Sequence, residues 1–400
     1  MKRLFSLFIA LLTLSAGLAH AQGNREPDPL PTPENNQIVY RSSDHQKITL
    51  NNANEFGVAY NDANSVYYPE DDYGVVSFDG NITTIGDWAF TNRATLVAVA
   101  WPSTVTSIGQ YAFNGCTNLN SVDLQEGVTS IGKSAFNGCA GQEELILPST
   151  VTSIGDGAFY GWTALTKLTV KAGSIGYQAF QNCTNLSSID LQESVTGIGE
   201  HAFDGCTNLS SINLPEGVTN IGDYAFQGCA SMATLILPST MTSIGQNAFS
   251  GCSTLTSVNI PASVTEIKGG AFLNCTNLAS ITFSNGATGI GGELLIGCTN
   301  LTLVKFLGYA VINPVTFMSI GTAESPVNLQ LPSTWLSTDK PINSATPWHG
   351  GYFNCEYADP VKEFLGEMGE PCTDCPVVEI KKGDKTVRLY NPEKVEFKKQ

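Results

Sequence analysis

A six-residue pattern, Ile-Gly-x-x-Ala-Phe, returns ten times along this chain, and some copies are altered at one or two positions. Eight of the nine intervals between the copies are 23 residues long and one is 21 residues long. A repeat this regular predicts a solenoid, in which each unit buries its apolar face only by stacking on its neighbours. The leading residues of the ten copies are Ile85, Ile108, Ile131, Ile154, Ile175, Ile198, Ile221, Ile244, Ile267 and Ile290.

Length and charge set further bounds. A chain of 400 residues ordinarily suggests several globular domains, but the core of a repeat array grows in one dimension, so we expect one long domain with end pieces. The formal net charge is -16, yet charged residues make up only 14% of the chain. Phosphate binding needs a basic stripe, so nucleic acid is excluded as an expected partner.

The N-terminus carries the pattern of a secretory signal peptide. Lys2 and Arg3 precede an apolar run from Leu4 to Leu18, and Ala19-His20-Ala21 forms a cleavage site, so we expect cleavage before Gln22. A membrane anchor is less favoured because the run is short for a bilayer span. No later stretch is apolar for long enough to cross a membrane. The sequence therefore predicts a secreted or cell-surface protein.

The rest of the chain divides by composition and by the repeat. We predict a signal peptide over 1–21, a Pro-rich linker over 22–36 and an N-terminal β cap over 37–79. The repeat array of about ten 23-residue units follows over 80–306. A degenerate last repeat and C-terminal cap are expected over 307–357, and a tail with a small β meander over 358–400.

One repeat unit assigns each residue type a role. Leu119, Val122 and Leu124 have the spacing L-x-x-L-x-L, and their alternation predicts a half-buried strand. A turn, Gln125–Gly127, follows; Gly132 then allows a tight bend and Ala135-Phe136 packs at the back. The 21-residue interval is expected to shorten a surface turn near Lys171. The expected fold is a β-rich, α/β-type solenoid with one parallel sheet, short helical or 3-10 turns on the opposite side, and caps at both ends.

The unit C-T-N-L-x-S-I-x-L-P-x-x-V-T-x-I-G-x-x-A-F-x-G resembles the BspA-type class of bacterial leucine-rich repeats from Val75 to Phe306. The segments Ile38–Ser42 and Gly74–Gly80 also resemble the N-terminal cap of relatives from the Bacteroides group. The resemblance implies a leucine-rich repeat arc, exported to the surface of a Gram-negative bacterium or beyond. It also implies protein binding and adhesion to host or matrix proteins.

One column of the repeat is cysteine in eight units, with Arg93 and Trp162 in the other two. Residues stacked in register keep their Cβ atoms about 4.8 Å apart, whereas a disulfide requires about 3.8 Å with converging bonds. We therefore expect a structural ladder of mostly free, buried thiols rather than a disulfide framework. Its members are Cys116, Cys139, Cys183, Cys206, Cys229, Cys252, Cys275 and Cys298.

Outside the array, Cys372 and Cys375 form a C-x-x-C pair. The following Pro-Val-Val offers no helix for a redox motif, and no second ligand pair completes a zinc site, so a local disulfide is favoured. The histidines that remain after signal cleavage are His45, His201 and His349, and they lie in unrelated segments. No catalytic motif is present. We expect no enzyme activity, no cofactor and no metal.

Two surfaces are candidates for binding. The solvent face of the predicted sheet is hydroxyl-rich and lacks the aromatic and arginine anchors of strong interfaces, so it either binds a partner or simply solvates the sheet. Its residues are Asn120, Ser121, Asp123, Ser187, Ser188, Asp190, Ser210, Ser211, Asn213, Thr256, Ser257 and Asn259, followed by Ala279, Ser280 and Thr282. The competing patch consists of turn-side aromatics, namely Trp88, Tyr111, Tyr160, Tyr177 and Tyr224.

These observations lead to one main hypothesis and one alternative. The main hypothesis is an exported, non-enzymatic scaffold that binds proteins, with adhesion to a host matrix protein or another surface protein taken from the resemblance. The alternative is a glycan-binding module, because a polar hydroxyl face can hydrogen-bond sugars. Sugar sites usually also contain exposed aromatic side chains, which the sheet face lacks and the turn side has.

Overall fold

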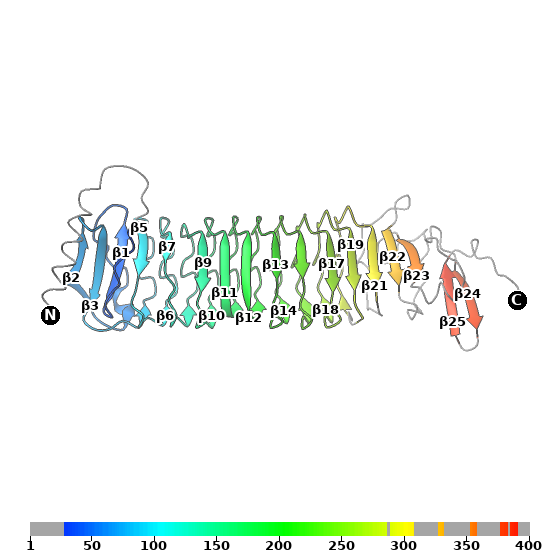
Figure 1. Cartoon of the computed structure of the whole chain (residues 1–400), viewed down its shortest axis with the longest axis horizontal. Helices are drawn as coiled ribbons and strands as arrows, with labels where there is room; N and C mark the ends of the chain where they lie inside the picture. Colours follow the sequence, from blue (N-terminus) through cyan, green and yellow to red (C-terminus); the bar gives the residue numbers. More distant parts are fainter. Residues whose placement is uncertain are drawn as a thin grey trace. The chain divides into compact units, whose positions relative to one another are not determined.

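A computed structural model of the chain describes residues 28–285, 289–307, 327–331, 353–357, 377–382 and 385–390. The predicted signal peptide, the start of the predicted linker, His349 and the Cys372–Cys375 pair lie outside these residues. Within them the repeats form successive coils, each stacked on the one before it in chain order (Figure 1).

The L-x-x-L-x-L segments form the front of each coil. In Glu144–Leu147 the side chains alternate between exposed and buried, as expected for a strand with one face on the core. Each front strand pairs in parallel with that of an adjacent coil wherever a pairing is present, as between Ser257 and Ser280. The front strands are β5 (Leu96–Ala100), β7 (Ser121–Val122), β9 (Glu144–Leu147), β11 (Lys167–Ile175), β12 (Ser188–Ile198), β13 (Ser211–Asn213), β15 (Thr234–Ile236), β17 (Ser257–Ile260), β19 (Ser280–Phe283) and β21 (Leu303–Phe306).

The predicted parallel sheet is present in the front strands, but a second parallel ladder runs beside them, which corrects the expectation of a single one. The second ladder consists of two-residue strands that end at the repeat isoleucines. The short turn at Lys171 makes β11 continuous, and β11 and β12 therefore belong to both ladders. The short strands are β4 (Thr84–Ile85), β6 (Ser107–Ile108), β8 (Ser130–Ile131), β10 (Ser153–Ile154), β14 (Asn220–Ile221), β16 (Ser243–Ile244), β18 (Glu266–Ile267) and β20 (Gly289–Ile290).

The Ala-Phe side of each coil consists of consecutive turns, which corrects the expectation of helical turns there. In the described residues the only helix is η1, a 3-10 helix at Ala53–Phe56 that precedes the array. The third residue after each repeat isoleucine is left-handed in all ten coils. Glycine fills this position twice and a residue with a Cβ eight times: Trp88, Tyr111, Ser134, Gly157, Gln178, His201, Tyr224, Asn247, Gly270 and Glu293.

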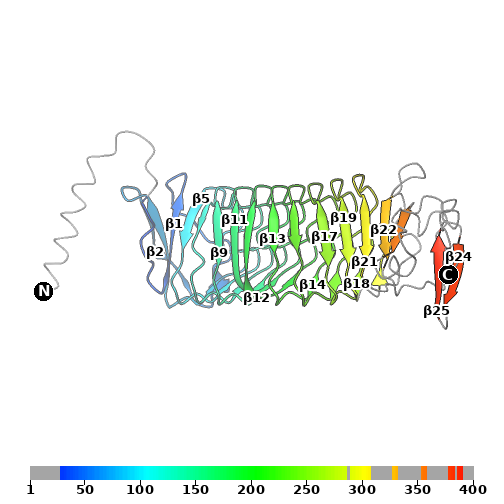
Figure 2. The ribbon, with the colours of Figure 1, turned by 45° about the vertical axis from the view of Figure 1, so that its right-hand side comes forward.

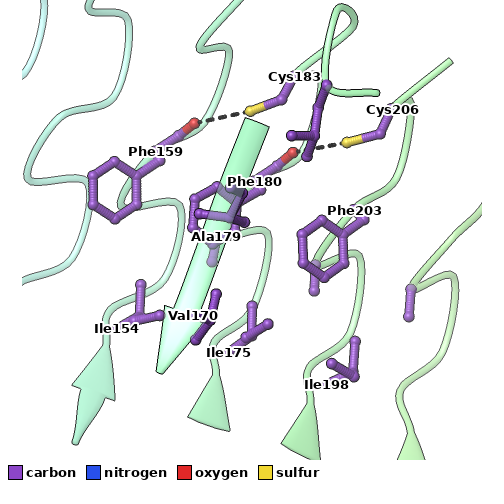
Figure 3. Packing of buried hydrophobic residues seen from close by; sticks show 14 of the residues in the cluster. Ile154, Phe159, Val170, Ile175, Ala179, Phe180, Cys183, Ile198, Phe203 and Cys206 are labelled. Atoms are coloured by element: carbon purple, nitrogen blue, oxygen red, sulfur yellow. Dashed lines mark hydrogen bonds between the residues drawn. The ribbon is translucent and has the colours of Figure 1, made fainter. Parts of the chain in front are cut away.

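The core is a set of columns, each contributed by one position of the repeat. The phenylalanines from Phe90 to Phe272 stack with ring centroids 5.0–5.6 Å apart and planes within 10° of parallel. Their alanine neighbours and the repeat isoleucines are buried beside them (Figure 3). Each phenylalanine between the two ends of the column therefore packs on the phenylalanine of the coil before it and on that of the coil after it, so one side chain contributes to two apolar contacts.

A glycine follows nine of the ten repeat isoleucines, with Lys268 after Ile267, and the absence of a side chain on the glycine allows the close approach of adjacent coils. A Cβ at Gly132 would lie 2.5 Å from the backbone nitrogen of Gln110 in the preceding coil, and one at Gly222 would lie 2.5 Å from that of Glu200. Neither glycine has a positive φ. The bend expected at Gly132 is therefore a packing constraint, while the left-handed backbone lies two residues later, at Ser134.

An antiparallel sheet precedes the first coil. It contains β1 (Gln37–Ser42), β2 (Tyr60–Tyr68) and β3 (Tyr73–Phe78), and β1 pairs with the first front strand through Tyr40 and Val99. This segment was predicted as the N-terminal cap, and its pairing occupies the backbone edge of the first coil (Figure 2).

Two further strands continue the front sheet after the last coil. They are β22 (Val327–Leu331), which pairs with β21, and β23 (Phe353–Tyr357), which pairs with β22, both in parallel. In the tail, β24 (Val377–Lys382) and β25 (Lys385–Tyr390) form an antiparallel hairpin.

Turns in adjacent coils are linked by a carboxylate. Glu216, in a Pro-Glu-Gly turn, accepts hydrogen bonds from the backbone nitrogen and the hydroxyl of Ser239 in the next Pro-Ser-Thr turn, at 3.2 and 2.9 Å. Glu126 accepts the same two bonds from Ser149, at 3.3 and 3.0 Å. The two turn sequences are therefore complementary when they occur in neighbouring coils.

The left-handed position predicts a side-chain preference. Gln178→Val is expected to lower the free energy of unfolding by about 1–3 kcal/mol, because a β-branched residue tolerates positive φ poorly. Gln178→Gly is the matched control, and it should preserve or raise stability because glycine adopts this backbone without strain. Urea denaturation measures both. Equal destabilisation by valine and glycine would show that side-chain contacts, not the backbone, govern this position.

The turn link predicts a pH effect. The pKa of the Glu216 carboxylate is lowered by the hydrogen bonds that it accepts, and the bond from the Ser239 backbone has the largest effect. Since the folded pKa lies below the unfolded one, the stabilisation is complete above the unfolded pKa and is lost as pH falls through the folded pKa. Glu216→Gln should therefore lower the melting temperature near pH 7, and the gap to the wild type should shrink towards about pH 3.

Glu193→Gln is the control for this experiment. Glu193 occupies the same turn position one coil earlier, and in the described part of the chain its carboxylate accepts no hydrogen bond. A melting temperature that follows the same pH course in both variants would contradict the assignment to Ser239.

Candidate functional site

The front sheet presents the polar face that the sequence predicts. All twelve of its principal predicted residues are exposed, and they lie in or beside β7, β12, β13 and β17. Some of the hydroxyls are used within the ladder, since Ser187 and Ser210 donate to backbone oxygens of the preceding coil at 3.1 and 3.2 Å. Those two serines stabilise the sheet, so the remaining side chains are freer to contact a partner.

Two exposed isoleucines on this face were missed at the level of sequence. The side chains of Ile146 and Ile236 are 47% and 62% exposed. Each is the second residue of a Leu-Ile-Leu-Pro-Ser-Thr segment and lies between two leucines that point to the core. The strand alternation was sufficient to find them, because the residue between two inward leucines must face solvent.

A groove interrupts the front sheet between coils two and three. The strands β7 and β9 do not pair with each other there, although each pairs with its other neighbour. The side chain of Gln142 bridges the gap: it accepts a hydrogen bond from the Val122 nitrogen and donates one to the Glu144 oxygen, both at 2.8 Å. The groove has a volume of about 460 Å³ and is lined by Val122, Asp123, Leu124, Gln125, Glu126, Gln142, Glu144, Ile146, Pro148 and Lys171.

Charges at the groove are partly paired. Lys167 Nζ lies 2.7 Å from Glu144 Oε1, and Lys171 Nζ lies 3.4 Å from Glu126 Oε1. Asp123 has no cationic group within 4.0 Å among the described residues. The groove thus combines an unpaired carboxylate with the exposed Ile146 in the adjacent coil.

The turn-side aromatics separate into two stacks and one isolated residue. Trp88 and Tyr111 stack with centroids 4.0 Å apart. His201 stacks on Tyr224 at 4.7 Å and meets the edge of Tyr177 at 5.9 Å. Tyr160 lies elsewhere and accepts a hydrogen bond from Asn182 at 2.8 Å. The sequence analysis did not include His201 in this surface, because it counted only the tyrosine and tryptophan rings of the turn side and considered the histidines separately.

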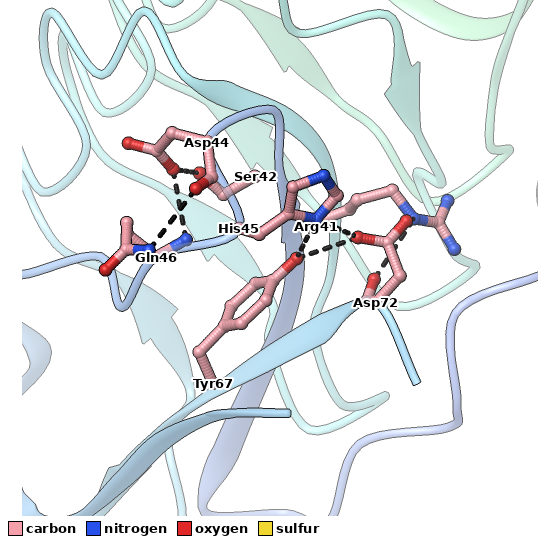
Figure 4. Close-up of polar contacts among 7 residues, drawn as sticks. All are labelled: Arg41, Ser42, Asp44, His45, Gln46, Tyr67 and Asp72. Atoms are coloured by element: carbon pink, nitrogen blue, oxygen red, sulfur yellow. Dashed lines mark hydrogen bonds and ion pairs between the residues drawn. The ribbon is translucent and has the colours of Figure 1, made fainter. Parts of the chain in front are cut away.

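A polar cluster joins the N-terminal strands (Figure 4). The carboxylate of Asp72 accepts hydrogen bonds from Tyr67 at 2.8 Å, and it pairs with Arg41 at 3.1 Å and with His45 Nδ1 at 2.8 Å. Burial, followed by the hydrogen bond to Asp72, raises the pKa of Tyr67. The hydroxyl of the buried Ser42 is directed to Asp44 instead of His45, so this cluster holds the strands together and lacks the arrangement of a catalytic triad.

The cysteine column is buried, and its eight members are free in the structure. Each Sγ donates to the backbone oxygen of a phenylalanine in the preceding coil, at 3.0–3.4 Å, as Cys183 and Cys206 illustrate (Figure 3). Trp162 takes the same position and donates its indole N–H to Phe136 at 2.9 Å. The column therefore requires a buried donor, which explains why tryptophan can replace cysteine there.

Metal-binding clusters and membrane-spanning helices are both absent from the part of the chain that the structure describes. It contains no group of three or more histidine, cysteine, aspartate or glutamate residues placed to hold a metal ion. None of its helices has the length and apolar character required to span a bilayer.

The stacked coils, parallel ladders and L-x-x-L-x-L front strands define a leucine-rich repeat β-solenoid. The chain matches the family described as BspA type leucine rich repeat region, in six copies, over residues 64–173 and 173–302. These matches span more than half of the chain, and the protein belongs to that family. The resemblance noted from the sequence is thereby confirmed. The family suggests a scaffold for protein interactions.

Solved structures of bacterial leucine-rich repeat proteins are similar to this chain. One from Bacteroides ovatus is 22% identical, covers 62% of this chain and 90% of its own, and has a TM-score of 0.32. One from T. pallidum is 31% identical, with coverages of 46% and 81% and a TM-score of 0.33. A leucine rich cell surface protein from Faecalibacterium prausnitzii is 25% identical, with coverages of 57% and 84% and a TM-score of 0.31. No curated protein is significantly similar.

The thiol column predicts low reactivity. Burial raises the pKa of Cys116, Cys183 and Cys252 to about 12, so these thiols are neutral near pH 7. Iodoacetamide should leave all eight ladder cysteines unlabelled in the folded protein and label them after denaturation without reductant. Peptide mass spectrometry measures both states. Disulfides among the ladder cysteines, or labelling of them in the folded protein, would contradict this description.

Proposed function

We propose that the protein is an exported, non-enzymatic scaffold that binds another protein through the front sheet face, and that it mediates adhesion at the cell surface to a host or matrix protein. The sequence supports export through its N-terminal signal pattern. Family membership supports protein binding. The solenoid supplies a rigid support, since each front strand is held by hydrogen bonds to the coils on one or both sides.

The observation that carries this proposal is the pair of exposed isoleucines. Ile146 and Ile236 lie four coils apart in the same outward column, so about 19 Å separates them at about 4.8 Å per coil. Bulky apolar side chains on a hydroxyl-rich surface gain most when a partner covers them. Uncharged neighbours such as Thr169 and Asn213 keep the free-energy cost of desolvating the surrounding face small.

The alternative function, glycan binding, is favoured by a different observation. Trp88 and Tyr177 are 43% and 41% exposed, and both belong to the aromatic stacks on the turn side. An exposed ring can cover the apolar face of a sugar. Glycan binding would use the turn side and leave the front sheet free. Substitutions on the turn side should therefore affect glycan binding, and substitutions on the front sheet should affect protein binding.

A binding panel tests the two functions. We expect purified protein to bind at least one immobilised extracellular matrix protein and no member of a polysaccharide panel, measured by biolayer interferometry. The double variant Ile146→Ser, Ile236→Ser should weaken protein binding about tenfold or more, because each isoleucine buried at an interface contributes about 1 kcal/mol or more. Its melting temperature should be unchanged, because both side chains are exposed.

The control is the double variant Trp88→Ala, Tyr177→Ala, which alters only the turn side. It should leave protein binding unchanged. One outcome would reject the adhesive function in favour of the glycan-binding one. In it, the wild type binds a polysaccharide but no matrix protein, and the Trp88→Ala, Tyr177→Ala variant no longer binds the polysaccharide.

A further inference from the structure

Three departures from the repeat lie together in the third and fourth coils, and one of them, Gln142, lines the groove between β7 and β9. Where eight of the ten coils place a cysteine, the fourth coil has the buried Trp162. Gly141 lies against that indole, and a Cβ at Gly141 would lie 2.8 Å from the ring. The next residue, Gln142, occupies the position that is a buried leucine or methionine in the other coils, such as Leu119 and Met232.

The geometry links these three residues. The bulk of Trp162 requires the glycine beside it, and Gly141 takes a left-handed backbone with φ of 74°. The side chain of Gln142 then accepts one hydrogen bond across the gap, from the Val122 nitrogen, and donates another to the Glu144 oxygen within its own coil. The core stays continuous through the indole, while the front strands are unpaired between β7 and β9, as they also are between β12 and β13 and between β15 and β17.

From this we propose that the groove between β7 and β9 binds an extended peptide segment of a partner protein, one that presents a lysine or arginine next to a bulky apolar side chain. This inference rests on the proposed function and specifies its site and the chemistry of the partner. It concerns the groove alone and leaves the rest of the front face as a secondary contact surface.

Charge and exposure determine the occupant. Asp123 and Ile146 occupy the same outward position in adjacent coils, and both line the groove. In the described residues no cation lies within 4.0 Å of the Asp123 carboxylate, while the glutamates beside it are paired with Lys167 and Lys171. A cationic side chain can therefore pair with Asp123 while its apolar neighbour covers Ile146.

An extended backbone fits the remaining surface. At the gap, strand-to-strand hydrogen bonds are replaced by one amide side chain, that of Gln142. Peptides that lie along an exposed strand edge gain affinity from main-chain hydrogen bonds and specificity from alternate side chains. A groove of about 460 Å³ holds a few residues of such a segment, not a folded domain.

Fluorescein-labelled heptapeptides with a Thr/Ser background test this inference by fluorescence anisotropy. The probes carry a central Lys-Leu, Glu-Leu or Lys-Ser pair. We expect the Lys-Leu peptide to bind the full chain at least tenfold more tightly than the other two. Asp123→Asn and Ile146→Ser should each weaken its binding by tenfold or more.

Matched variants on the same column are the controls. Ile236→Ser alters the equivalent isoleucine of an identical Leu-Ile-Leu-Pro-Ser-Thr segment, and Asp190→Asn alters another aspartate of the outward column. Both should leave peptide binding unchanged. Equal affinity for the three peptides, or equal losses in the groove variants and the controls, would overturn the inference.

The failures of the two proposals are distinguishable. If the peptides do not discriminate but binding of a matrix protein still requires Ile236, the groove is not the peptide site and the front face keeps its function. If Lys-Leu peptides bind at Asp123 and Ile146 while no matrix protein binds, the groove stands and matrix adhesion is rejected.

Discussion

The contact between identical positions of adjacent coils is the constraint on which the rest of the structure depends. A coil repeat close to 5 Å brings each phenylalanine onto the next and places each repeat glycine against the backbone of the preceding coil. At this spacing a buried residue must pack on the residues at the same position of the neighbouring coils. The strictness of the 23-residue period is therefore a packing requirement, and it arises before any requirement of function.

The cysteine column shows how the stack of coils accommodates a different residue at a buried position. A thiol and an indole differ greatly in volume, yet Cys139 and Trp162 each donate to a phenylalanine oxygen in the preceding coil. Both side chains form the same hydrogen bond, but the indole is much larger than the thiol, so the chain around Trp162 must adjust to its volume. That adjustment falls on Gly141 and Gln142, and it reaches the surface as a break in the front sheet.

The solenoid, its front strands and its buried columns were accessible from sequence because they depend on periodicity, and a period of 23 residues is visible in one chain. The second ladder was not accessible, because the two-residue strands that end at isoleucines such as Ile131 are defined by pairing between coils and not by local alternation. Similarly, the reason for Gly132 depended on the distance to Gln110 in the neighbouring coil. The front-face residues were correctly placed on the surface, but nothing in their identity distinguishes a contact from a solvated side chain.

The candidate site follows a different logic from the fold. In a repeat protein the consensus residues are committed to the stack, so recognition must come from positions that depart from it. An isolated departure such as Ile236 changes one side chain on the surface and leaves the core columns as they are. Departures that are coupled through the core, as Trp162 is coupled to Gly141 and Gln142, change the backbone and create a concave feature. A substitution in the buried column can therefore shape the surface of the next coil, and in this chain the groove lies where the packing of the core has been altered.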